Sequence, residues 1–334
     1  MMSKKQLGQF FTKNGEYIVG NLLNIFPINS TIIDPFAGEN DLLNLLDSSY
    51  NKIGYDIDPK LIDIIKSDSL LNPIDYTDKW ILTNPPYLAK NKNKDKTIYE
   101  KYGVDDLYKA SLKSIIGCVG GVIIVPLNFL SDEDNEFRKI FLSKYKIVDI
   151  NIFEERVFAD TDYTVCAFSF IREDNTSQII KPLIYPHKII KEFEINYDFG
   201  YTIGNEFNVL LSNYDKTLKI GRLLIDDNPS TNLFLRAVDT GSLDGKISLS
   251  INDKHFYGKD TDRVFASIIS NRKFTYDEEI LICEKFNQII EQYREKYHSL
   301  FLTNYRNSSK VYARKRISFD IAYRLINHIV FKHL

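Results

Sequence analysis

The tetrapeptide Asn84-Pro85-Pro86-Tyr87 combines residue types that suit chemistry on a planar nitrogen. Two consecutive prolines restrict the backbone and remove two N–H donors, so the segment presents carbonyl oxygens and the Asn84 amide in a nearly fixed array. The Asn84 side-chain oxygen and the Pro85 carbonyl oxygen would accept the two hydrogens of an exocyclic amine, which localises the nitrogen lone pair for attack on a methyl group. Tyr87 offers a flat ring for stacking on a flipped-out base. We therefore predict that Asn84, Pro85, Pro86 and Tyr87 form a catalytic loop that works by positioning and electrostatics.

Three aspartates precede this tetrapeptide at positions that suit a nucleoside. Asp34 and Asp56 end two short apolar segments, and Asp68 follows further along the chain. A carboxylate at the end of a second strand can accept both ribose hydroxyls, and Gly38 lets the backbone come close to a ligand. Two acidic residues just after Gly38 disfavour a pyrophosphate. This pattern favours a nucleoside with a cationic group, S-adenosylmethionine, over NAD or ATP. A turn glycine beside helix-capping aspartates is the alternative interpretation.

The elements expected to hold these residues alternate between short apolar strands and helical segments, which is typical of a parallel α/β sheet. Strands are predicted at 31–34, 52–56, 79–83, 121–126, 147–153 and 163–171, the last of them antiparallel, and helices at 41–46, 61–66, 105–118 and 132–142. Ligands bind beyond the carboxyl ends of the strands in such a sheet, so the aspartates and the tetrapeptide should meet there. After about residue 175 come short strands and two long amphipathic segments, at 277–297 and 317–331. We therefore predict two domains, 1–175 and 176–334, the second of mixed α+β type.

Composition limits the class of protein. The 334 residues are 44% hydrophobic and 26% charged, which is ordinary for a globular chain, and no apolar run approaches the ~18 residues of a membrane span. The three cysteines and five histidines are scattered, without the close spacing of a disulfide framework or a zinc site. We expect a cytoplasmic protein, in a bacterial cell or in the host compartment of a viral genome, with no metal and no membrane association.

Two clusters of basic residues contrast with the net charge of −2. Binding to nucleic acid depends on where basic residues cluster more than on the total charge, although a solvated charged face is the plainer explanation for either cluster. The candidate nucleic-acid contacts are Lys90, Lys92 and Lys94, which follow Tyr87, and Arg314, Lys315 and Arg316 near the C-terminus.

Taken together, these motifs resemble the gamma-type N6-adenine DNA methyltransferases of restriction–modification systems, the TaqI-like and HincII-like enzymes, in family order over about residues 4–171. Asp34–Gly38 is similar to their first cofactor motif, Asp56 to the ribose ligand, Asp68 to the ligand of the cofactor's adenine amine, and Asn84–Tyr87 to the catalytic motif. The resemblance implies S-adenosylmethionine as cofactor, with contacts from Phe11, Thr12, Asp34, Phe36, Ala37, Gly38, Asp56, Ile57, Asp68, Ser69 and Asn84.

Two further positions matter for the resemblance. Val157-Phe158 is similar to a late family motif whose phenylalanine stacks on the second face of the target base, so Phe158 is expected in that role beside Tyr87, with Phe153 as its competitor. Asn40 stands where many members have glycine. We expect altered local geometry there, without loss of cofactor binding.

The resemblance implies a Rossmann-like class I methyltransferase sheet with a C-terminal α+β target-recognition domain. It also implies a flipped-out adenine in double-stranded DNA as substrate and a companion restriction endonuclease as partner. Arg236, Arg263 and Arg272 are unranked candidates for base or phosphate contacts. Adenine in RNA, cytosine N4 and the side-chain amide of a protein glutamine remain alternative substrates, because each presents a similar nitrogen. A non-catalytic DNA-binding subunit is a further alternative, although it would predict a degenerate catalytic loop.

Overall fold

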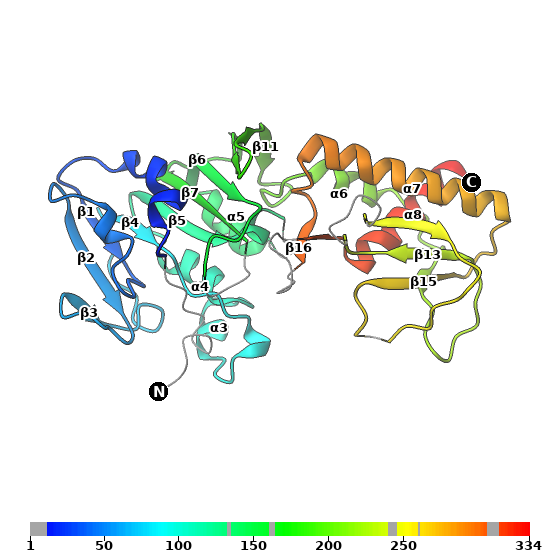
Figure 1. Cartoon of the computed structure of the whole chain (residues 1–334), viewed down its shortest axis with the longest axis horizontal. Coiled ribbons are helices and arrows are strands. Elements are labelled where there is room, and N and C mark those ends of the chain that lie inside the picture. The colour runs from blue at the N-terminus through cyan, green and yellow to red at the C-terminus, as the bar shows by residue number, and fades with distance from the viewer. Residues whose placement is uncertain (1–11, 132–134, 160–163, 240–245, 260, 306–313) are drawn as a thin grey trace. The chain divides into compact units, whose positions relative to one another are not determined.

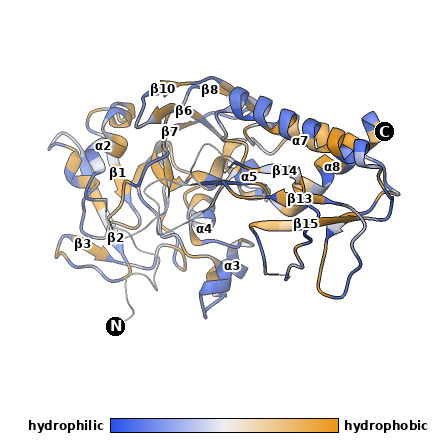
Figure 2. Cartoon of the chain, turned by 45° about the vertical axis from the view of Figure 1, so that its right-hand side comes forward, coloured by the Kyte–Doolittle hydropathy of each residue, from blue (hydrophilic) through white to orange (hydrophobic). Residues whose placement is uncertain are grey.

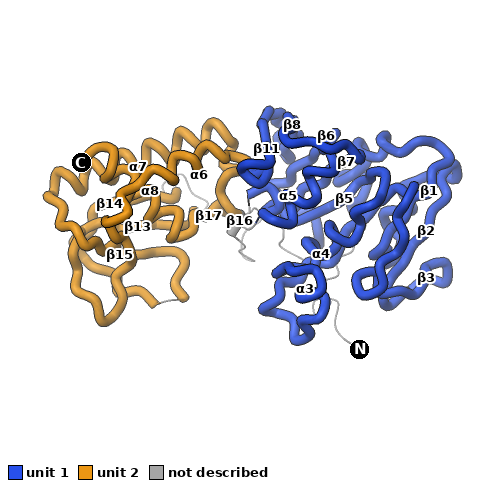
Figure 3. The backbone as a smooth tube through the Cα atoms, turned by 180° about the vertical axis from the view of Figure 1, so that it is seen from behind, with its two compact units in different colours: residues 1–202, 308–313 blue, residues 203–307, 314–334 orange. Residues whose placement is uncertain are grey.

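The computed structural model describes residues 12–131, 135–159, 164–239, 246–259, 261–305 and 314–334 (Figure 1). The chain divides into two compact units, of which the described parts lie within 12–202 for unit 1 and within 203–305 and 314–334 for unit 2 (Figure 3). Each unit has its own sheet and its own helices, and each is described by itself below.

Unit 1 is built on a nine-stranded sheet in the order β10-β9-β6-β7-β5-β4-β1-β2-β3. Strands β1 to β5 pair in parallel, whereas β7 runs antiparallel to both β5 and β6, as the sequence predicted. The strands are β1 (Thr31–Asp34), β2 (Asn51–Asp56), β3 (Ile64–Lys66), β4 (Trp80–Thr83), β5 (Gly120–Pro126), β6 (Tyr145–Phe153), β7 (Val165–Arg172), β9 (Leu183–Tyr185) and β10 (Ile189–Ile190).

The strand order reverses at β1, which lies between β2 and β4. A ligand crevice opens at such a switch point in doubly wound sheets, beyond the carboxyl ends of the strands. Asp34 ends β1, and Asn84 directly follows β4, so both lie at this point. The α/β, Rossmann-like fold class predicted from the sequence is thereby confirmed.

The helices of unit 1 are short. They are α2 (Gly15–Val19), α3 (Thr97–Tyr102), α4 (Leu107–Ser114) and α5 (Glu136–Leu142), with single 3-10 turns η1 (Gly20–Ile25), η2 (Leu43–Leu45), η3 (Lys90–Lys92) and η4 (Leu127–Leu130). The helix expected at 41–46 is only the turn η2. The prediction of a helix at 61–66 is wrong, because Ile64–Lys66 forms the edge strand β3 and pairs in parallel with β2. An isolated six-residue helix has little stability in water, whereas pairing with β2 gives the backbone N–H and C=O groups of these residues hydrogen-bond partners.

The two compact units divide after Thr202, whereas the domain boundary expected from the sequence lies near residue 175. Strand β9 pairs in parallel with β6 and so extends the sheet of unit 1, while β8 (Ser177–Ile180) and β11 (Phe193–Asn196) pair with each other beside it. Arg138 of α5 is fully buried and donates to the Gly200 carbonyl at 2.6 Å and to the Thr202 hydroxyl at 2.5 Å. A buried guanidinium is costly unless its donors are satisfied, so these bonds fix the end of unit 1.

Unit 2 has the mixed α+β character that the sequence predicted. Its four-stranded antiparallel sheet has the order β12-β15-β13-β14. A threonine–glutamate capping box starts the long helix α7, whose amphipathic surface shows both colours in Figure 2. The elements are α6 (Asn205–Ser212), β12 (Ile220–Arg222), β13 (Leu233–Arg236), β14 (Ser248–Ile251), β15 (Phe265–Ser270), α7 (Tyr276–Tyr297), β16 (Thr303–Tyr305), β17 (Arg314–Arg316) and α8 (Phe319–His333).

Candidate active site

A cavity of about 300 Å³ opens at the carboxyl ends of β1, β2 and β4. Its size lies at the lower end of the range for small-molecule sites. Ten residues expected to contact the cofactor line it together: Thr12, Asp34, Phe36, Ala37, Gly38, Asp56, Ile57, Asp68, Ser69 and Asn84. The eleventh, Phe11, lies outside the described residues. The residues predicted from the sequence to bind the cofactor thus lie around one cavity, while their individual roles stay predictions.

The turn after β1 explains the departure at Asn40. Gly38 and Asn40 both adopt left-handed backbone conformations, with φ of 56° and 66°. Asparagine tolerates this region better than most residues, so Asn40 takes the conformation that a second glycine would take. Its side chain donates to Asp63 at 3.0 Å, and Asn40 is not among the residues that line the cavity.

Asp34 is the most deeply buried carboxyl of the site, at 2% exposure. Burial raises its pKa to about 7, against hydrogen bonds from the Thr83 hydroxyl at 2.6 Å and the Phe36 N–H at 3.0 Å, which lower it. The nearby charge of Asp56 raises the pKa further. A cation in the cavity would favour the ionised carboxylate.

Asp56 and Asp68 keep acceptor capacity for a ligand. Each oxygen of Asp56 accepts one backbone N–H, from Gly38 at 3.0 Å and from Asp58 at 2.8 Å. A second lone pair on each oxygen suits two vicinal hydroxyls. One oxygen of Asp68 accepts from the N–H groups of Leu70 and Leu71, and its other oxygen is left as an acceptor for an amine.

Asn84 links the loop 84–87 to the segment that begins at Thr12. Its amide nitrogen donates to the Thr12 hydroxyl at 3.0 Å, and its amide oxygen accepts from the Tyr87 hydroxyl at 2.5 Å. The Tyr87 hydroxyl also lies 3.0 Å from the carbonyl oxygen of Ile124, so one hydroxyl hydrogen faces two acceptors. Tyr87 is only 2% exposed, and its ring is not among the groups that line the cavity. Stacking of Tyr87 on a base therefore requires its ring to become uncovered.

The two candidate stacking phenylalanines differ in their surroundings. Phe153 stacks on Tyr185 at 4.9 Å between ring centroids and contacts Tyr17 at 5.6 Å, so its ring belongs to the core. Phe158 is also buried, but it lies in a loop whose neighbouring Val157 carbonyl accepts from the Asn14 side chain at 3.2 Å. Neither phenylalanine lines the cavity, and the stacking role of Phe158 stays a prediction.

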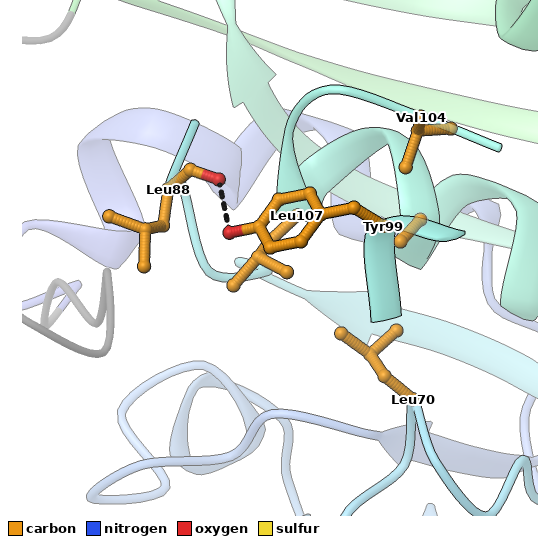
Figure 4. Packing of buried hydrophobic residues seen from close by; sticks show 6 residues of the cluster. Leu70, Leu88, Tyr99, Val104 and Leu107 are labelled. Atoms are coloured by element: carbon orange, nitrogen blue, oxygen red, sulfur yellow. Dashed lines mark hydrogen bonds between the residues drawn. The ribbon is translucent and has the colours of Figure 1, made fainter. Parts of the chain in front are cut away.

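Sequence reasoning missed the segment 88–107 as part of the cavity wall. Leu88, Asn93, Asp95, Ile98 and Leu107 all line the cavity. Figure 4 shows how this segment is anchored: Leu88 and Leu107 pack in one hydrophobic cluster with Leu70, Tyr99 and Val104, and the Tyr99 hydroxyl donates to the Leu88 carbonyl at 2.9 Å. The sequence at 90–96 alternates lysine with asparagine or aspartate, a pattern that indicates a charged, solvent-exposed segment and gives no sign of this hydrophobic packing.

The predicted basic contacts fall into two groups. Lys92 and Lys94 are exposed, and Lys90 is half-buried. Lys315, in contrast, is 8% exposed within β17, between half-buried Arg314 and Arg316. In this structure Lys92 and Lys94 are thus better placed to meet a phosphate than Lys315.

The chemistry of the lining fits a nucleoside that carries positive charge. Five aspartates line the cavity, and no lysine, arginine or histidine occurs among the lining residues that the structure describes. Apolar side chains such as Leu70, Leu71 and Ile98 provide a surface for a purine ring. Such a lining disfavours a phosphate and accommodates a sulfonium or ammonium group. The residues present therefore fit S-adenosylmethionine.

No group of three or more histidine, cysteine, aspartate or glutamate side chains within the described residues is arranged to hold a metal ion. Among the same residues, no helix has the length and apolarity needed to cross a membrane.

The sequence matches no known family model and no curated protein. Solved structures give partial matches. The chain is similar to a modification subunit of a putative type I restriction enzyme from Vibrio vulnificus YJ016, with 16% identity, coverage of 61% of this chain and 52% of that chain, and a TM-score of 0.44. It is also similar to a putative class I S-adenosylmethionine-dependent methyltransferase from Listeria monocytogenes, with 17% identity, coverage of 52% and 63%, and a TM-score of 0.42.

A third similar structure is the M protein of the type I restriction enzyme EcoKI, with 14% identity, coverage of 53% of this chain and 48% of that chain, and a TM-score of 0.40. The matches span about half to three-fifths of the length of these proteins. The function proposed below therefore rests on the residues of the site.

Proposed function

We propose that the protein is an S-adenosylmethionine-dependent methyltransferase that acts on N6 of a flipped-out adenine in double-stranded DNA, within a restriction–modification or related DNA-marking system. One observation carries the proposal: Asn84, at the end of β4, shares a cavity with the acidic strand ends Asp34, Asp56 and Asp68. A methyl donor and a planar nitrogen would thus meet in one place. Double-stranded DNA is the proposed partner, with a restriction endonuclease as companion.

The chain's own residues would orient both reactants. The free acceptors of Asp56 suit the ribose hydroxyls, and the remaining oxygen of Asp68 suits the adenine amine of the cofactor. S-adenosylmethionine would supply an electrophilic methyl group. The acidic wall that includes Asp34 would stabilise the positive charge that this group carries.

The amide of Asn84 must turn for the proposed chemistry. In the structure its nitrogen faces Thr12, a residue that lines the cavity, and its oxygen faces the buried Tyr87 hydroxyl. A half-turn of the amide would direct the oxygen toward the cavity to accept a hydrogen of the target amine. The amide nitrogen would then donate to the Tyr87 hydroxyl, which in turn would donate to the Ile124 carbonyl.

The test is transfer of labelled methyl from S-adenosylmethionine to double-stranded DNA by the purified chain. The Asn84→Ala variant should lose transfer by a factor of about 100 or more, because it removes an acceptor needed in the transition state, while the chain still binds the cofactor through the three aspartates. Full activity of Asn84→Ala would contradict the catalytic assignment. Label on RNA or protein alone would replace DNA as the substrate, and sequencing of methylated DNA identifies the base and its position.

A further inference from the structure

The four-stranded sheet of unit 2 has one buried face and one partly exposed face. Leu233, Leu235, Leu249, Ala266 and Ile268 point to the other face and are at most 1% exposed. Since side chains alternate along a strand, the residues between them point the opposite way. We call this second surface the open face and define it by Phe234, Arg236, Ser248, Ser250 and Phe265, which are half-buried or exposed and lie opposite one another in register. Ser267, opposite Phe234, lies on the same face but is only 2% exposed.

Arg236 is held at the end of an aromatic stack on the open face. Phe234 of β13 stacks on Phe265 of β15 with ring centroids 5.7 Å apart and planes within 17°. The guanidinium of Arg236 lies over the same Phe265 ring at 5.5 Å. Stacking on a ring restrains a guanidinium without using any of its N–H donors.

Those donors of Arg236 have no hydrogen-bond or ion-pair partner among the residues that the structure describes. Other arginines of unit 2 are engaged. Arg222 donates to the Asp262 carbonyl, Arg272 pairs with Glu278 at 2.7 Å, and Arg294 pairs with Asp239 at 2.7 Å. Arg236 therefore differs from these three: its guanidinium lies over an aromatic ring, and its N–H donors are not engaged by the described residues.

The surroundings of Arg236 suit an electron-rich partner. The remaining residues of the open face are aromatic rings and hydroxyls, without a carboxylate. Phe256 and Tyr257, which are 37% and 47% exposed, belong to a loop attached to this sheet by the Phe256 N–H, which donates to the Ser267 hydroxyl at 2.8 Å. The open face thus presents the guanidinium of Arg236 surrounded by aromatic rings and hydroxyl groups.

We propose that Arg236 reads a guanine in the major groove of double-stranded DNA, donating two parallel hydrogen bonds to the O6 and N7 atoms of the base. This inference rests on the proposed function, in which DNA is the substrate. A guanidinium of fixed plane matches the two adjacent acceptors of guanine, the commonest specific contact of arginine with DNA. A phosphate contact needs no such restraint, and exposed Arg263 suits it better. Arg236 thereby becomes the first ranked candidate for sequence recognition.

The experiment is selection from a pool of random-sequence 40-base-pair duplexes by the purified full-length chain and by Arg236→Lys. Lysine keeps the charge but lacks the planar fork. The wild-type chain should enrich a motif that contains guanine, and Arg236→Lys should lose the preference at one guanine by about tenfold, with non-specific affinity nearly unchanged. The matched control is Arg324→Lys on α8, whose arginine pairs with Asp320 in the same helix and lies outside the open face.

The outcomes separate the inference from the proposed function. An enriched motif that is the same in Arg236→Lys, a uniform loss of affinity for all sequences, or the absence of any enriched motif in the wild type would each overturn the role of Arg236. Circular dichroism and the melting temperature of Arg236→Lys check that unit 2 stays folded. Methyl transfer is measured separately on the same wild-type preparation, so loss of the enzymatic proposal is visible even when the binding preference is present.

Discussion

At the scale of single residues, Asp34 is a buried carboxyl whose protonation state would depend on a cation in the cavity. Its carboxyl has almost no access to water, and its pKa of about 7 compares with an ordinary value of 3.8. Between these two pKa values, the folded chain without cofactor keeps a proton on Asp34 that the unfolded chain has released. A bound cation would reverse this preference, because it stabilises the carboxylate.

This linkage predicts a pH dependence of stability. Because the folded pKa lies above the unfolded one, the contribution of Asp34 is fully present below about pH 4 and is lost as the pH rises through about 7. We expect the cofactor-free chain to lose unfolding free energy between pH 5 and 8, and Asp34→Asn to lose measurably less. Asparagine keeps an acceptor for Thr83 but does not titrate. Urea denaturation at both pH values measures the difference, and equal losses in the two proteins would disprove the role of Asp34.

Tyr87 offers a second prediction at the same scale, because its buried hydroxyl contacts the Asn84 amide. Tyr87→Phe keeps the ring but removes the hydroxyl. If the hydroxyl positions Asn84, kcat should fall by about tenfold, the value of a typical buried hydrogen bond, while DNA affinity is unchanged. Tyr108→Phe, whose ring contacts that of Tyr87 edge-on, is the control. An unaltered kcat in Tyr87→Phe would leave only the stacking role predicted from the sequence.

At the scale of elements, the segment 88–107 has two sides with different tasks. Lys101 of α3 is exposed but donates to the carbonyls of Leu70 and Leu71 at 2.9 and 2.8 Å, and both leucines line the cavity. Lys92 and Lys94 turn outward to solvent. The same run of lysines thus serves the cavity wall and the outer surface.

This division predicts opposite effects of lysine substitutions. The double variant Lys92→Ala/Lys94→Ala should weaken DNA binding for all sequences and lower the slope of log affinity against log salt by about 2, since each lost phosphate contact removes about 0.9. Its cofactor affinity should not change. Lys101→Ala should do the reverse and weaken cofactor binding a few-fold. Fluorescence anisotropy with a duplex and calorimetry with the cofactor measure both, and identical profiles of the two variants would refute the division.

The same elements show what the sequence could and could not predict. Strand ends are local: Asp34, Asp56 and Asn84 follow short apolar runs, so their meeting at one edge of a parallel sheet was predictable. The strand Ile64–Lys66 was not, because three residues have no clear period and only their pairing with β2 makes them a strand. The burial of Tyr87 was equally hidden, since it depends on the Ile124 carbonyl and the Tyr108 ring far along the chain.

At the scale of the whole molecule, every residue that lines the cavity belongs to unit 1, between Thr12 and Leu107. The open face, by contrast, lies wholly in unit 2. Cofactor binding and sequence recognition are therefore assigned to separate cores.

Because the cavity lies in unit 1 alone, we predict that cofactor binding slows hydrogen exchange in unit 1 and leaves unit 2 nearly unchanged. Binding to the native state lowers the rate of local opening only for the elements that the ligand contacts. In hydrogen exchange on the full-length protein, S-adenosylmethionine should slow exchange by at least about tenfold in peptides that cover 34–42, 56–71 and 84–107. Peptides from 203–305 and 314–334 should change by less than about twofold. Asn84→Ala, which keeps the lining aspartates, should show the same pattern. Comparable protection in unit 2 would mean that the cofactor orders both cores, and the assignment of binding to unit 1 alone would fail.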